Sequence, residues 1–431
     1  MTTHTTSLPP APPDTDAVLP VEAARALARR FAEPVETSER VALRDALGRV
    51  LADDVASPLD VPAYDNSAMD GYAFDGVLLT ARAESDPLAL TVAGQALAGH
   101  PFDGAVPAGG CVRIMTGALL PAGTDTVIPL ERIALDGDTV RFSSVGVARG
   151  DHCRRAGEDL GRGSRVLHAG RIVRAADLGL LASLGIAEVA VRRRLRVAFF
   201  STGDELRTPD EPLGAGGLYD SNRATLYGIL TRLNVEPLDL GIVRDDPAAL
   251  EHALRTAAAR ADAIITSGGV SVGDADFTRV LMARLGDVTF ASVALRPGRP
   301  LACGRIWSGE RSARPALLFG LPGNPVAVAV AFHVIVRDAL FAMMGAEPQP
   351  TPHYPAVCTH ALPKRPGRTE YLRGIASRTA DGAWQVTPAG SQSSASLAGL
   401  AAANCFIVLA HDTARVDAGA TVDILPFDGS I

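Results

Sequence analysis

The sequence predicts a multidomain α/β protein, with a doubly wound α/β domain accompanied by β-rich domains. Three observations support this fold class. Strand-length apolar runs alternate with helix-length segments between residues 191 and 345. Short apolar runs separated by Gly and Pro lie before and after that region. The 431 residues also exceed one ordinary domain of about 100–200 residues.

In the central region the alternation is typical of a sheet covered by helices on both faces. The expected strands are LRVAFF, VEPLDLGIV, ADAIIT and PALLFG. The expected helices are DSNRATLYGILTRLN, DPAALEHALRTAAAR, DFTRVLMARLG and NPVAVAVAFHVIVRDALFAMM. Asp220 or Ser221 is suited to cap the first helix, because a short polar side chain accepts a hydrogen bond from the free N–H groups there.

The flanking segments have other patterns. Residues 21–47 look helical apart from one interrupting proline, and residues 176–185 form an amphipathic helix closed by Gly185. Short apolar runs between residues 88 and 147 predict a compact β domain. The Pro-rich residues 346–355 are expected to be a linker, and the remaining residues a small β domain.

Charge and cysteine content exclude several classes of protein. The net charge of -7 and pI of about 5.7 argue against a general nucleic-acid binder, which needs a basic face. A local basic pocket for an anionic small molecule remains compatible with this balance. Five cysteines without a CxxC pair predict reduced, mostly buried thiols in a cytoplasmic protein, and they disfavour a zinc site.

The N-terminal region gives no targeting signal. Residues 1–17 are polar and Pro-rich and lack the basic and apolar parts of a signal peptide, so we expect a disordered leader. No apolar run approaches the ~18 residues of a membrane span. The longest, Val326–Val336, is short and contains His333, which predicts a buried helix and no membrane association.

Glycine-containing polar loops follow three of the expected strands. Because ligands bind at the carboxyl ends of strands in open α/β sheets, we expect these loops to form one site. Gly268 and Gly269 allow the backbone to approach a phosphate, and a helix starting near Asp276 adds a positive dipole end. The candidate substrate-binding residues in these loops are Ser201, Thr202, Gly203, Ser267, Gly268, Gly269, Ser271, Gly273, Pro322, Gly323 and Asn324.

Carboxylates crowd the same loops. Asp204, Glu205, Asp274 and Asp276 would repel a phosphate unless a cation lay between them. Mg²⁺ prefers a few carboxylates plus substrate oxygens, so Glu205, Asp274 and Asp276 are the expected metal ligands. The GxxxxGK[ST] pattern is absent, which disfavours ordinary nucleoside triphosphatase chemistry. Taken singly, each loop is more often a tight turn or a helix start.

Basic and mixed polar segments complete the candidates. Arg296 and Arg299 lie on a Pro/Gly turn and suit a phosphate or another oxyanion, although a solvated turn has the same pattern. Upstream, Asp65, Thr116 and Asp159 lie in loops that are dense in polar side chains. Each of these loops alone is more often a solvated face.

Eight strings that occur in order between Pro62 and Pro325 resemble the molybdopterin molybdenumtransferase family, which includes bacterial MoeA and the E domain of gephyrin. The strings are PAYDNSAMDGYA, RIMTGA, RRAGEDL, STGDEL, RDDP, SGGVSVGDAD, RPGRP and LPGNP. With the domain pattern, the resemblance covers nearly the whole chain from about residue 18.

The resemblance implies an elongated, L-shaped subunit of four domains. Residues 18–50 and 151–190 would form a discontinuous linker or dimerisation domain, and residues 51–150 a β-rich insertion domain. Residues 191–345 would form the molybdopterin-binding α/β domain, and residues 346–431 a C-terminal β-barrel-like domain. The family is dimeric, with an active cleft between the α/β domain of one subunit and the insertion domain of the other.

The resemblance also implies roles for individual residues. Thr116 and residues 267–269 match substrate-contacting positions. The chain departs from the family where Arg296 and Arg299 stand in place of the usual lysines, and Ser292 in place of another. Arginine binds bidentately and lysine as a point charge, so the departure leaves the strength of molybdate binding open. The positions that match the active cleft are Asp65, Asp159, Glu205, Asp245 and Asp276.

The activity implied by the resemblance is insertion of molybdate into adenylylated molybdopterin, with release of AMP and with Mg²⁺ present, by a cytoplasmic homodimer. Molybdopterin adenylyltransferase and molybdoenzyme maturation factors are the implied protein partners. One alternative is an adenylyltransferase, for which the α/β domain alone would suffice. Another is a scaffold of the gephyrin type, which the short leader disfavours. The sheet loops alone suggest a generic phosphosugar- or nucleotide-binding protein.

Overall fold

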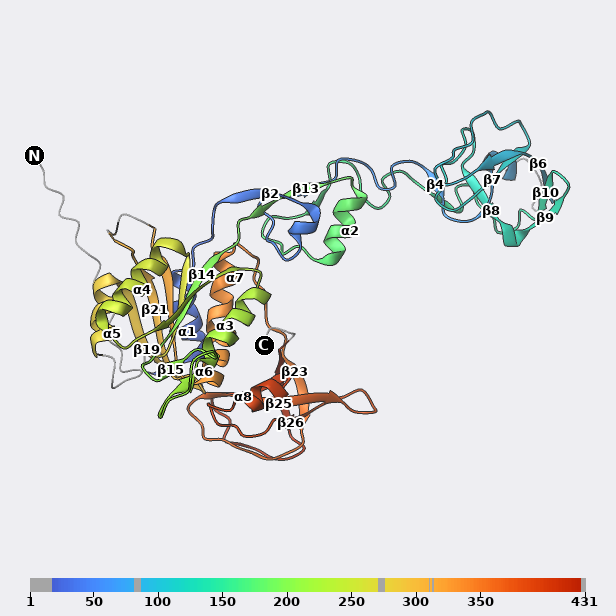
Figure 1. Ribbon diagram of the computed structural model, residues 1–431. Coiled ribbons are helices and arrows are strands. Elements are labelled where there is room, and N and C mark those ends of the chain that lie inside the picture. Colours follow the sequence, from blue (N-terminus) through green and yellow to red (C-terminus); the bar gives the residue numbers. More distant parts are fainter. Residues whose placement is uncertain (1–17, 81–86, 270–275, 310, 312–313, 428–431) are drawn as a thin grey trace, which may run out of the picture. The chain divides into compact units, whose positions relative to one another are not determined.

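A computed structural model describes residues 18–80, 87–269, 276–309, 311 and 314–427. The chain divides into two compact units (Figure 1). The first unit comprises Met1–Ala52, Gly170–Arg174 and Glu188–Ile431. The second comprises Asp53–Ala169 and Ala175–Ala187.

The first unit is built on a seven-stranded sheet in the order β1-β19-β21-β22-β18-β14-β17. The four predicted strands are present and run parallel to their neighbours, from β17 to β22. Strand β21 runs antiparallel to both of its neighbours, β22 and β19, and this makes the sheet mixed. The bounds are β1 Val18–Leu19, β14 Arg196–Thr202, β17 Glu236–Val243, β18 Ala263–Ser267, β19 Gly286–Val293, β21 Pro300–Ile306 and β22 Ala316–Leu321.

Helices cover both faces of this sheet (Figure 1). Along β14, Val197 and Phe199 pack into one core, whereas Ala198 and Phe200 pack into the other, as strand alternation requires. Helices α4 and α5 belong to the second core, and the remaining helices below belong to the first. The bounds are α1 Val21–Arg30, α3 Ser221–Arg232, α4 Pro247–Arg260, α5 Asp276–Leu285, α6 Pro325–Ala331 and α7 Arg337–Met343.

A π-helical segment, Phe332–Val336, joins α6 to α7. The resulting helix, Pro325–Met343, has the length and apolarity of a membrane span, but 78% of its apolar window is buried inside the protein. It contributes to the first core, with His333 only 5% exposed. The prediction of a buried helix here is confirmed.

One local prediction was wrong. Residues 35–47 do not continue a helical pattern: Ser38–Ala42 form strand β2, and Leu43–Ala46 form a 3₁₀ turn. Strand β2 pairs antiparallel with β13, Glu188–Arg192, over five residues. These hydrogen bonds come from a segment about 150 residues away, and such tertiary pairing overrides local helix propensity.

The C-terminal part of the first unit is a closed β-barrel. The sheet order is β20-β25-β26-β23-β29-β27, and an additional β25–β27 pairing closes the cycle. The first strand, β20, lies in the segment before the RPGRP turn and pairs parallel with β25. The bounds are β20 Leu295–Arg296, β23 Tyr354–Cys358, β25 Thr369–Arg378, β26 Trp384–Pro388, α8 Leu397–Ala402, β27 Cys405–Leu409 and β29 Thr421–Pro426, with the short pair β24 Leu362–Pro363 and β28 Arg415–Val416.

The second unit is centred on a six-stranded sheet in the order β8-β5-β7-β6-β10-β9. Its strands are β5 Gly71–Phe74, β6 Leu88–Ala96, β7 Gly110–Ile114, β8 Thr126–Pro129, β9 Ile133–Asp136 and β10 Thr139–Phe142. Two short pairs, β3–β12 (Val55–Ala56 with Arg165–Leu167) and β4–β11 (Asn66–Ser67 with Cys153–Arg154), bring the outgoing and returning chain together.

The stem of this excursion is held by two backbone hydrogen bonds. The N–H of Ser57 donates to the carbonyl of Ser164 at 2.9 Å, and the N–H of Gly163 donates to the carbonyl of Ser57 at 2.8 Å. Helix α2, Ala175–Ser183, also belongs to this unit. The N–H of Ile186 bonds back to the carbonyl of Leu181, and Gly185 has φ +71°, which confirms the predicted glycine-closed end.

Candidate functional site

The predicted loops meet at the carboxyl ends of β14, β18 and β22. The N–H of Gly268 donates to the carbonyl of Leu321 at 3.1 Å, which joins the β18 and β22 loops. On its other side, a Cβ at Gly268 would lie 2.7 Å from the carbonyl oxygen of Thr202. Gly268 also has φ +91°, and Gly269 has φ +69°. Only glycine fits this double constraint, so the two glycines serve the close approach expected of them.

Asn222, at the start of α3, ties two of these loops together. Its side-chain nitrogen donates to the hydroxyl of Ser267 and to the carbonyl of Gly323, both at 2.7 Å. The side chain is buried, and no described residue donates a hydrogen bond to its carbonyl oxygen. Sequence reasoning missed Asn222; its place just after the cap Asp220, at a strand-to-helix turn, is the only signal that marked it.

Next to the glycines is a small cleft between the β14, β17 and β18 strand ends and helices α4 and α5. The hydroxyl oxygens of Thr202 and Thr266 line this cleft, and both are buried without a hydrogen-bond partner among the described residues. Unsatisfied buried hydroxyls favour a ligand that bonds them. Arg244 and Asp245 also line the cleft.

Not every predicted residue has a free polar group. Ser201 is 1% exposed, and its hydroxyl donates to the Asp220 carboxylate at 2.9 Å. Asp220 in turn caps α3, as predicted. The carbonyl of Pro322 accepts from the hydroxyl of Ser267 at 3.4 Å. Asn324 is the N-cap residue of α6 but makes no side-chain cap hydrogen bond.

Carboxylates lie at the neighbouring strand ends. Asp204 and Glu205 follow β14, and Asp245 follows β17; all three are exposed. The N–H of Asp245 donates to the Asp204 carboxylate at 3.3 Å, so the two loops touch. The Glu205 carboxylate folds back over Gly203, where a Cβ would lie 2.5 Å from it.

The expected metal ligands are only partly described. Ser271, Gly273 and Asp274 lie outside the described residues. Asp276 begins helix α5, as predicted, but the position of its side chain is not described. Among the residues that the structure describes, no group of three or more His, Cys, Asp or Glu side chains is arranged to hold a metal ion.

The RPGRP turn lies beside the first turn of α6. A Cβ at Gly298 would lie 3.4 Å from the carbonyl oxygen of Ala327, so the turn packs closely on the helix. Arg296 forms an ion pair with Glu370 at 3.3 Å, and Arg299 is exposed without a side-chain partner among the described residues. Ser292 is half-buried on β19.

The barrel adds a buried arginine that sequence reasoning did not identify. Arg373 is fully buried, and its Nη2 atom donates to the carbonyls of Ser391 and Ser393. Its Nε and Nη1 atoms have no hydrogen-bond partner within the described ranges, and burial lowers the pKa of its guanidinium. The adjacent Ser394 carbonyl accepts from the N–H of Val326 at 3.0 Å, at the start of α6. An arginine inside an apolar strand was the only sequence signal.

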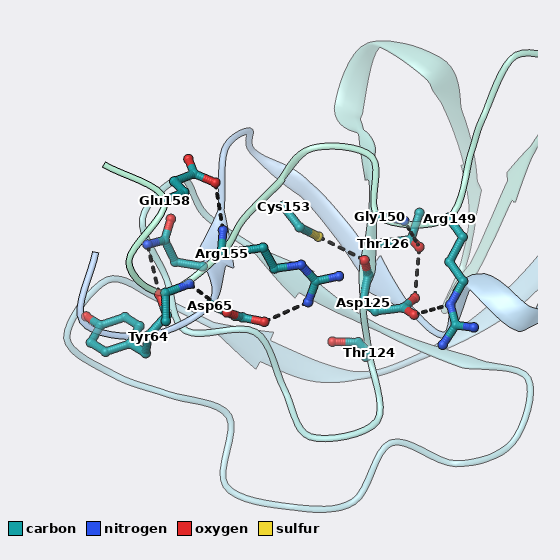
Figure 2. Close-up of polar contacts among 12 residues, drawn as sticks. Tyr64, Asp65, Thr124, Asp125, Thr126, Arg149, Gly150, Cys153, Arg155 and Glu158 are labelled. Atoms are coloured by element: carbon teal, nitrogen blue, oxygen red, sulfur yellow. Dashed lines mark hydrogen bonds and ion pairs between the residues drawn. The ribbon is translucent and has the colours of Figure 1, made fainter. Parts of the chain in front are cut away.

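Asp65, in the second unit, is held in a defined position (Figure 2). Its two carboxylate oxygens accept from Arg155 Nη1 at 2.7 Å and from the N–H of Ala156 at 2.8 Å. The N–H of Ala156 and the guanidinium of Arg155 lower the pKa of Asp65. Asp65 is therefore a stable anion that orients Arg155.

The neighbouring Cys153 is half-buried, and its Sγ lies 3.2 Å from the carbonyl oxygen of Asp125 (Figure 2). Burial raises the pKa of the Cys153 thiol to about 11, so this thiol is protonated at neutral pH. Asp125 itself pairs with Arg149 through its carboxylate.

Thr116 and Asp159 also lie in the second unit. Both the N–H and the hydroxyl of Thr116 donate to the Asp70 carboxylate at 2.7 Å. These two bonds lower the pKa of Asp70. Asp159 is exposed, and its N–H donates to the carbonyl of Val61 at 3.0 Å.

Comparison with known proteins accounts for the whole architecture. A family model described as "MoeA N-terminal region (domain I and II)" matches residues 19–185, and one described as "Probable molybdopterin binding domain" matches residues 198–342. A third, "MoeA C-terminal region (domain IV)", matches residues 355–427. The fold is thus that of a multidomain protein built around a molybdopterin-binding type of α/β domain.

Relatives match over nearly the full chain. A molybdopterin molybdenumtransferase of Haemophilus influenzae is 42% identical over 397 residues, covering 92% of this chain and 95% of its own. One of Nostoc sp. is 36% identical and covers 90% and 89%. The crystal structure of the molybdopterin biosynthesis MoeA protein of Pyrococcus horikoshii is 28% identical, has a TM-score of 0.81 and covers 95% of this chain and 100% of its own. The chain belongs to the MoeA family of molybdopterin molybdenumtransferases.

Proposed function

We propose that this protein transfers molybdenum from molybdate to adenylylated molybdopterin, with release of AMP. The supporting observation is the strand-edge cleft, where two buried threonine hydroxyls and the backbone around Gly268 and Gly269 are placed to meet a phosphate. The full-length match to relatives named for this transferase supports the same activity.

In this proposal the adenylyl phosphates lie against the β18 loop. The hydroxyls of Thr202 and Thr266 donate to phosphate oxygens and so gain the partners that they lack. Asn222 fixes the spacing between the β18 and β22 loops before the substrate arrives. Arg244 at the rim adds a positive charge beside the leaving AMP.

Molybdate is the second substrate, and we propose that Arg296 and Arg299 bind it. Arg299 is exposed, and its guanidinium has no hydrogen-bond partner in the part of the chain that the structure describes; a guanidinium binds a tetrahedral oxyanion with two parallel N–H groups. Helix α6 lies next to the same turn, and the positive end of its dipole adds to the potential there. This local cationic surface offsets the net negative charge of the chain.

We further propose that Mg²⁺ is bound by Glu205, with Asp274 and Asp276 as additional ligands. Mg²⁺ commonly uses one or two carboxylates and completes its shell with substrate phosphates and water, so an exposed Glu205 after β14 fits the ion. When bound, the ion would neutralise charge on the pyrophosphate. Glu205 would supply one carboxylate ligand from the loop that follows β14.

The active state is proposed to be a cytoplasmic homodimer, in which Asp65, Thr116 and Asp159 act with Glu205, Asp245 and Asp276 of the other subunit. Asp65 stays ionised and orients Arg155, so we propose an orienting role for it rather than proton transfer. Five free cysteines are consistent with a reducing compartment. Molybdopterin adenylyltransferase and molybdoenzyme maturation factors remain the proposed protein partners.

AMP release tests the proposed function. Purified protein is incubated with adenylylated molybdopterin and Mg²⁺, with and without micromolar molybdate. We expect AMP release that requires molybdate. AMP release with tungstate but not molybdate would change the metal assignment, and production of adenylylated molybdopterin from free molybdopterin and ATP would instead establish an adenylyltransferase. Absence of release and of substrate binding would refute the proposed function.

A further inference from the structure

A cleft lies at the amino ends of strands β18 and β22, at the sheet edge opposite to the substrate loops. Asp262 directly precedes β18, and Pro315 directly precedes β22. Strand β21 runs antiparallel to β22, so Arg305, near the carboxyl end of β21, lies at the same edge. Phe31, which follows α1, also lines this amino-edge cleft. All of these residues belong to the first unit, and an occupant of the cleft leaves the loops at the other edge open.

One part of the amino-edge cleft is apolar. Leu317 and Met343 are 2% and 3% exposed, and Phe31 and Pro315 are half-buried. Burial of apolar surface contributes about 25 cal/mol per Å², so an apolar side chain of a ligand gains free energy here. The remaining lining residues are charged and make the cleft amphipathic: Glu33, Asp262, Arg305 and Arg314.

Arginines stack on both aromatic rings beside the cleft. The guanidinium of Arg305 lies 5.2 Å from the ring centre of Phe31 and 5.4 Å from that of Trp307. Arg30 stacks on Phe31 at 5.4 Å, and Arg311 stacks on Trp307 at 5.0 Å. Stacking holds a guanidinium in place while its N–H groups stay available at its edge. The rings themselves are engaged by cations and offer little surface on which a nucleobase could stack.

Arginines outnumber carboxylates around the cleft. The Asp262 carboxylate accepts from Arg193 Nη1 and Nη2 at 2.8 and 2.7 Å, and Arg314 Nη1 lies 4.0 Å away. The Asp287 carboxylate is shared in the same way by the two arginines that stack on Trp307, at 3.1 and 2.9 Å. Each of these carboxylates has two guanidinium neighbours, so a surplus of positive charge remains for a ligand.

Donor groups in this surface lack acceptors among the described residues. The Nε atom of Arg305 and the indole nitrogen of Trp307 are buried without a hydrogen-bond partner in that part of the chain, and Trp307 is only 6% exposed. The Arg314 side chain is 47% exposed, and its 4.0 Å contact with Asp262 is too long for a hydrogen bond. Unsatisfied donors favour a ligand rich in acceptors. A carboxylate is such a ligand, because a guanidinium binds it with two parallel N–H groups.

We propose that the amino-edge cleft binds an acidic segment of a partner protein. Carboxylates of the segment bind Arg305 and Arg314, and a neighbouring apolar side chain packs against the apolar part of the cleft. A nucleic acid fits less well, because the net charge of the chain is -7 and arginines already stack on the aromatic rings. The substrate loops lie at the opposite edge, so the partner binds without blocking them. This inference does not rest on the proposed function.

The test measures binding of a short fluorescein-labelled peptide in which Glu and Leu alternate, by fluorescence anisotropy at low ionic strength. We expect saturable binding that weakens as salt is added. Arg314→Glu reverses one charge and should raise the Kd about tenfold. Glu33→Gln removes a competing carboxylate from the cleft and should lower the Kd. A peptide with Ser in place of Leu should bind about fivefold more weakly, because it loses the apolar contact.

The matched control is Arg141→Glu in the second unit. Arg141 is 55% exposed and lies 4.0 Å from Asp136, so it resembles Arg314 in exposure and in the length of its ion pair. Because the change in net charge is the same, this variant should bind the peptide with the wild-type Kd. Molybdate-dependent AMP release by Arg314→Glu should match that of the wild type, since Arg314 lies away from the substrate loops.

Each other outcome would overturn the inference. If the wild type does not bind the peptide, or binds the Glu/Leu and Glu/Ser peptides equally, the amphipathic cleft is not a docking site. If Arg314→Glu keeps the wild-type Kd, the peptide binds elsewhere. Tighter binding of a single-stranded oligonucleotide than of the peptide would replace the protein partner by a nucleic acid. If Arg314→Glu does not fold, Arg311→Glu, at a side chain that is 50% exposed, gives the same comparison.

Discussion

The side-chain nitrogen of Asn222 lies 2.7 Å from the hydroxyl oxygen of Ser267 and 2.7 Å from the carbonyl oxygen of Gly323. A single buried amide thus spans two loops that begin at different strands. The donor group of Asn222 sets the width of the gap between the β18 and β22 loops. Together with the backbone bond from Gly268 to Leu321, this side chain holds the two loops at a fixed separation.

We expect Asn222→Ala to weaken binding of adenylylated molybdopterin at least tenfold and to lower the free energy of unfolding by about 1–3 kcal/mol, because the buried Ser267 hydroxyl and the Gly323 carbonyl lose their donor. Equilibrium binding and urea unfolding measure the two effects. Thr231→Ala on the same helix is the control, since its exposed hydroxyl bonds only to the carbonyl of Tyr227. Wild-type binding by Asn222→Ala would contradict the role of this amide.

Glu205 is the described carboxylate that the magnesium proposal uses. Glu205→Ala should reduce molybdate-dependent AMP release at least tenfold and raise the Mg²⁺ concentration required, because a metal-bound carboxylate is lost. Glu211→Ala, in the following loop, is the comparison, because the Glu211 carboxylate accepts its hydrogen bonds among the described residues from Thr208, and its loss should not affect the Mg²⁺ requirement. Full activity of Glu205→Ala at limiting Mg²⁺ would remove Glu205 from the site.

Asp65 is predicted to act as a permanent anion. Its pKa is lowered by the N–H of Ala156 and by Arg155, so lowering the pH from 8 to 5 should not titrate it. Its ion pair contributes stability above the unfolded pKa near 3.8, and this stability is lost as the pH falls through the lower folded value. Asp65→Asn should therefore reduce AMP release at every pH in this range by a similar factor.

Complementation tests the proposed pairing of subunits. If Asp65 and Glu205 of different subunits share a site, mixtures of Asp65→Asn and Glu205→Ala proteins should recover activity through mixed dimers. Each mixed dimer would then contain one site with both native residues and one with both substitutions. Mixtures that stay as inactive as the separate variants, while exchange of subunits is demonstrated, would show that the two residues do not act across subunits.

His333 should make stability depend on pH. Burial, then the charges of Arg337 and Arg25, lowers the pKa of His333 to about 4. Between pH 6.5 and about 4 the unfolded chain takes up a proton that the folded protein resists, so stability falls with falling pH. The expected slope approaches about 1.4 kcal/mol per pH unit. His333→Phe should flatten the pH dependence of the urea midpoint in this range. The control is His252→Gln, at an exposed position of α4, which should leave this pH dependence unchanged.

The sequence predicted the parts of the site that follow from local rules. Three such features depend on residues close together in the chain, and the structure confirms each of them. They are the glycine turn at Gly268 and Gly269, the helix cap at Asp220 and the helix end at Gly185. The parallel core strands were predicted because their apolar runs are continuous. Strand β2 was not predicted, because its partner β13 lies far away in sequence.

The contacts that were missed share one property: they join distant segments. Glu370 and Arg296 are 74 residues apart, and Asn222 and Gly323 are 101 residues apart. No periodicity within a short window reports such a pair. A charged or amide residue beside an apolar run could be noticed, as at Arg373, but its partners could be named only once the barrel and the sheet were assembled.

The hydrogen-bonded stem at Ser57 and Ser164 has a consequence for how the chain can vary in length. The chain between these two residues leaves the stem and returns to it at one point. The contacts that close this segment therefore lie within the second unit. Closure entropy grows only slowly, by about 0.6 kcal/mol for each doubling of loop length. Residues 58–163 can therefore gain or lose whole hairpins at small thermodynamic cost, and the first unit always receives the same two adjacent chain ends.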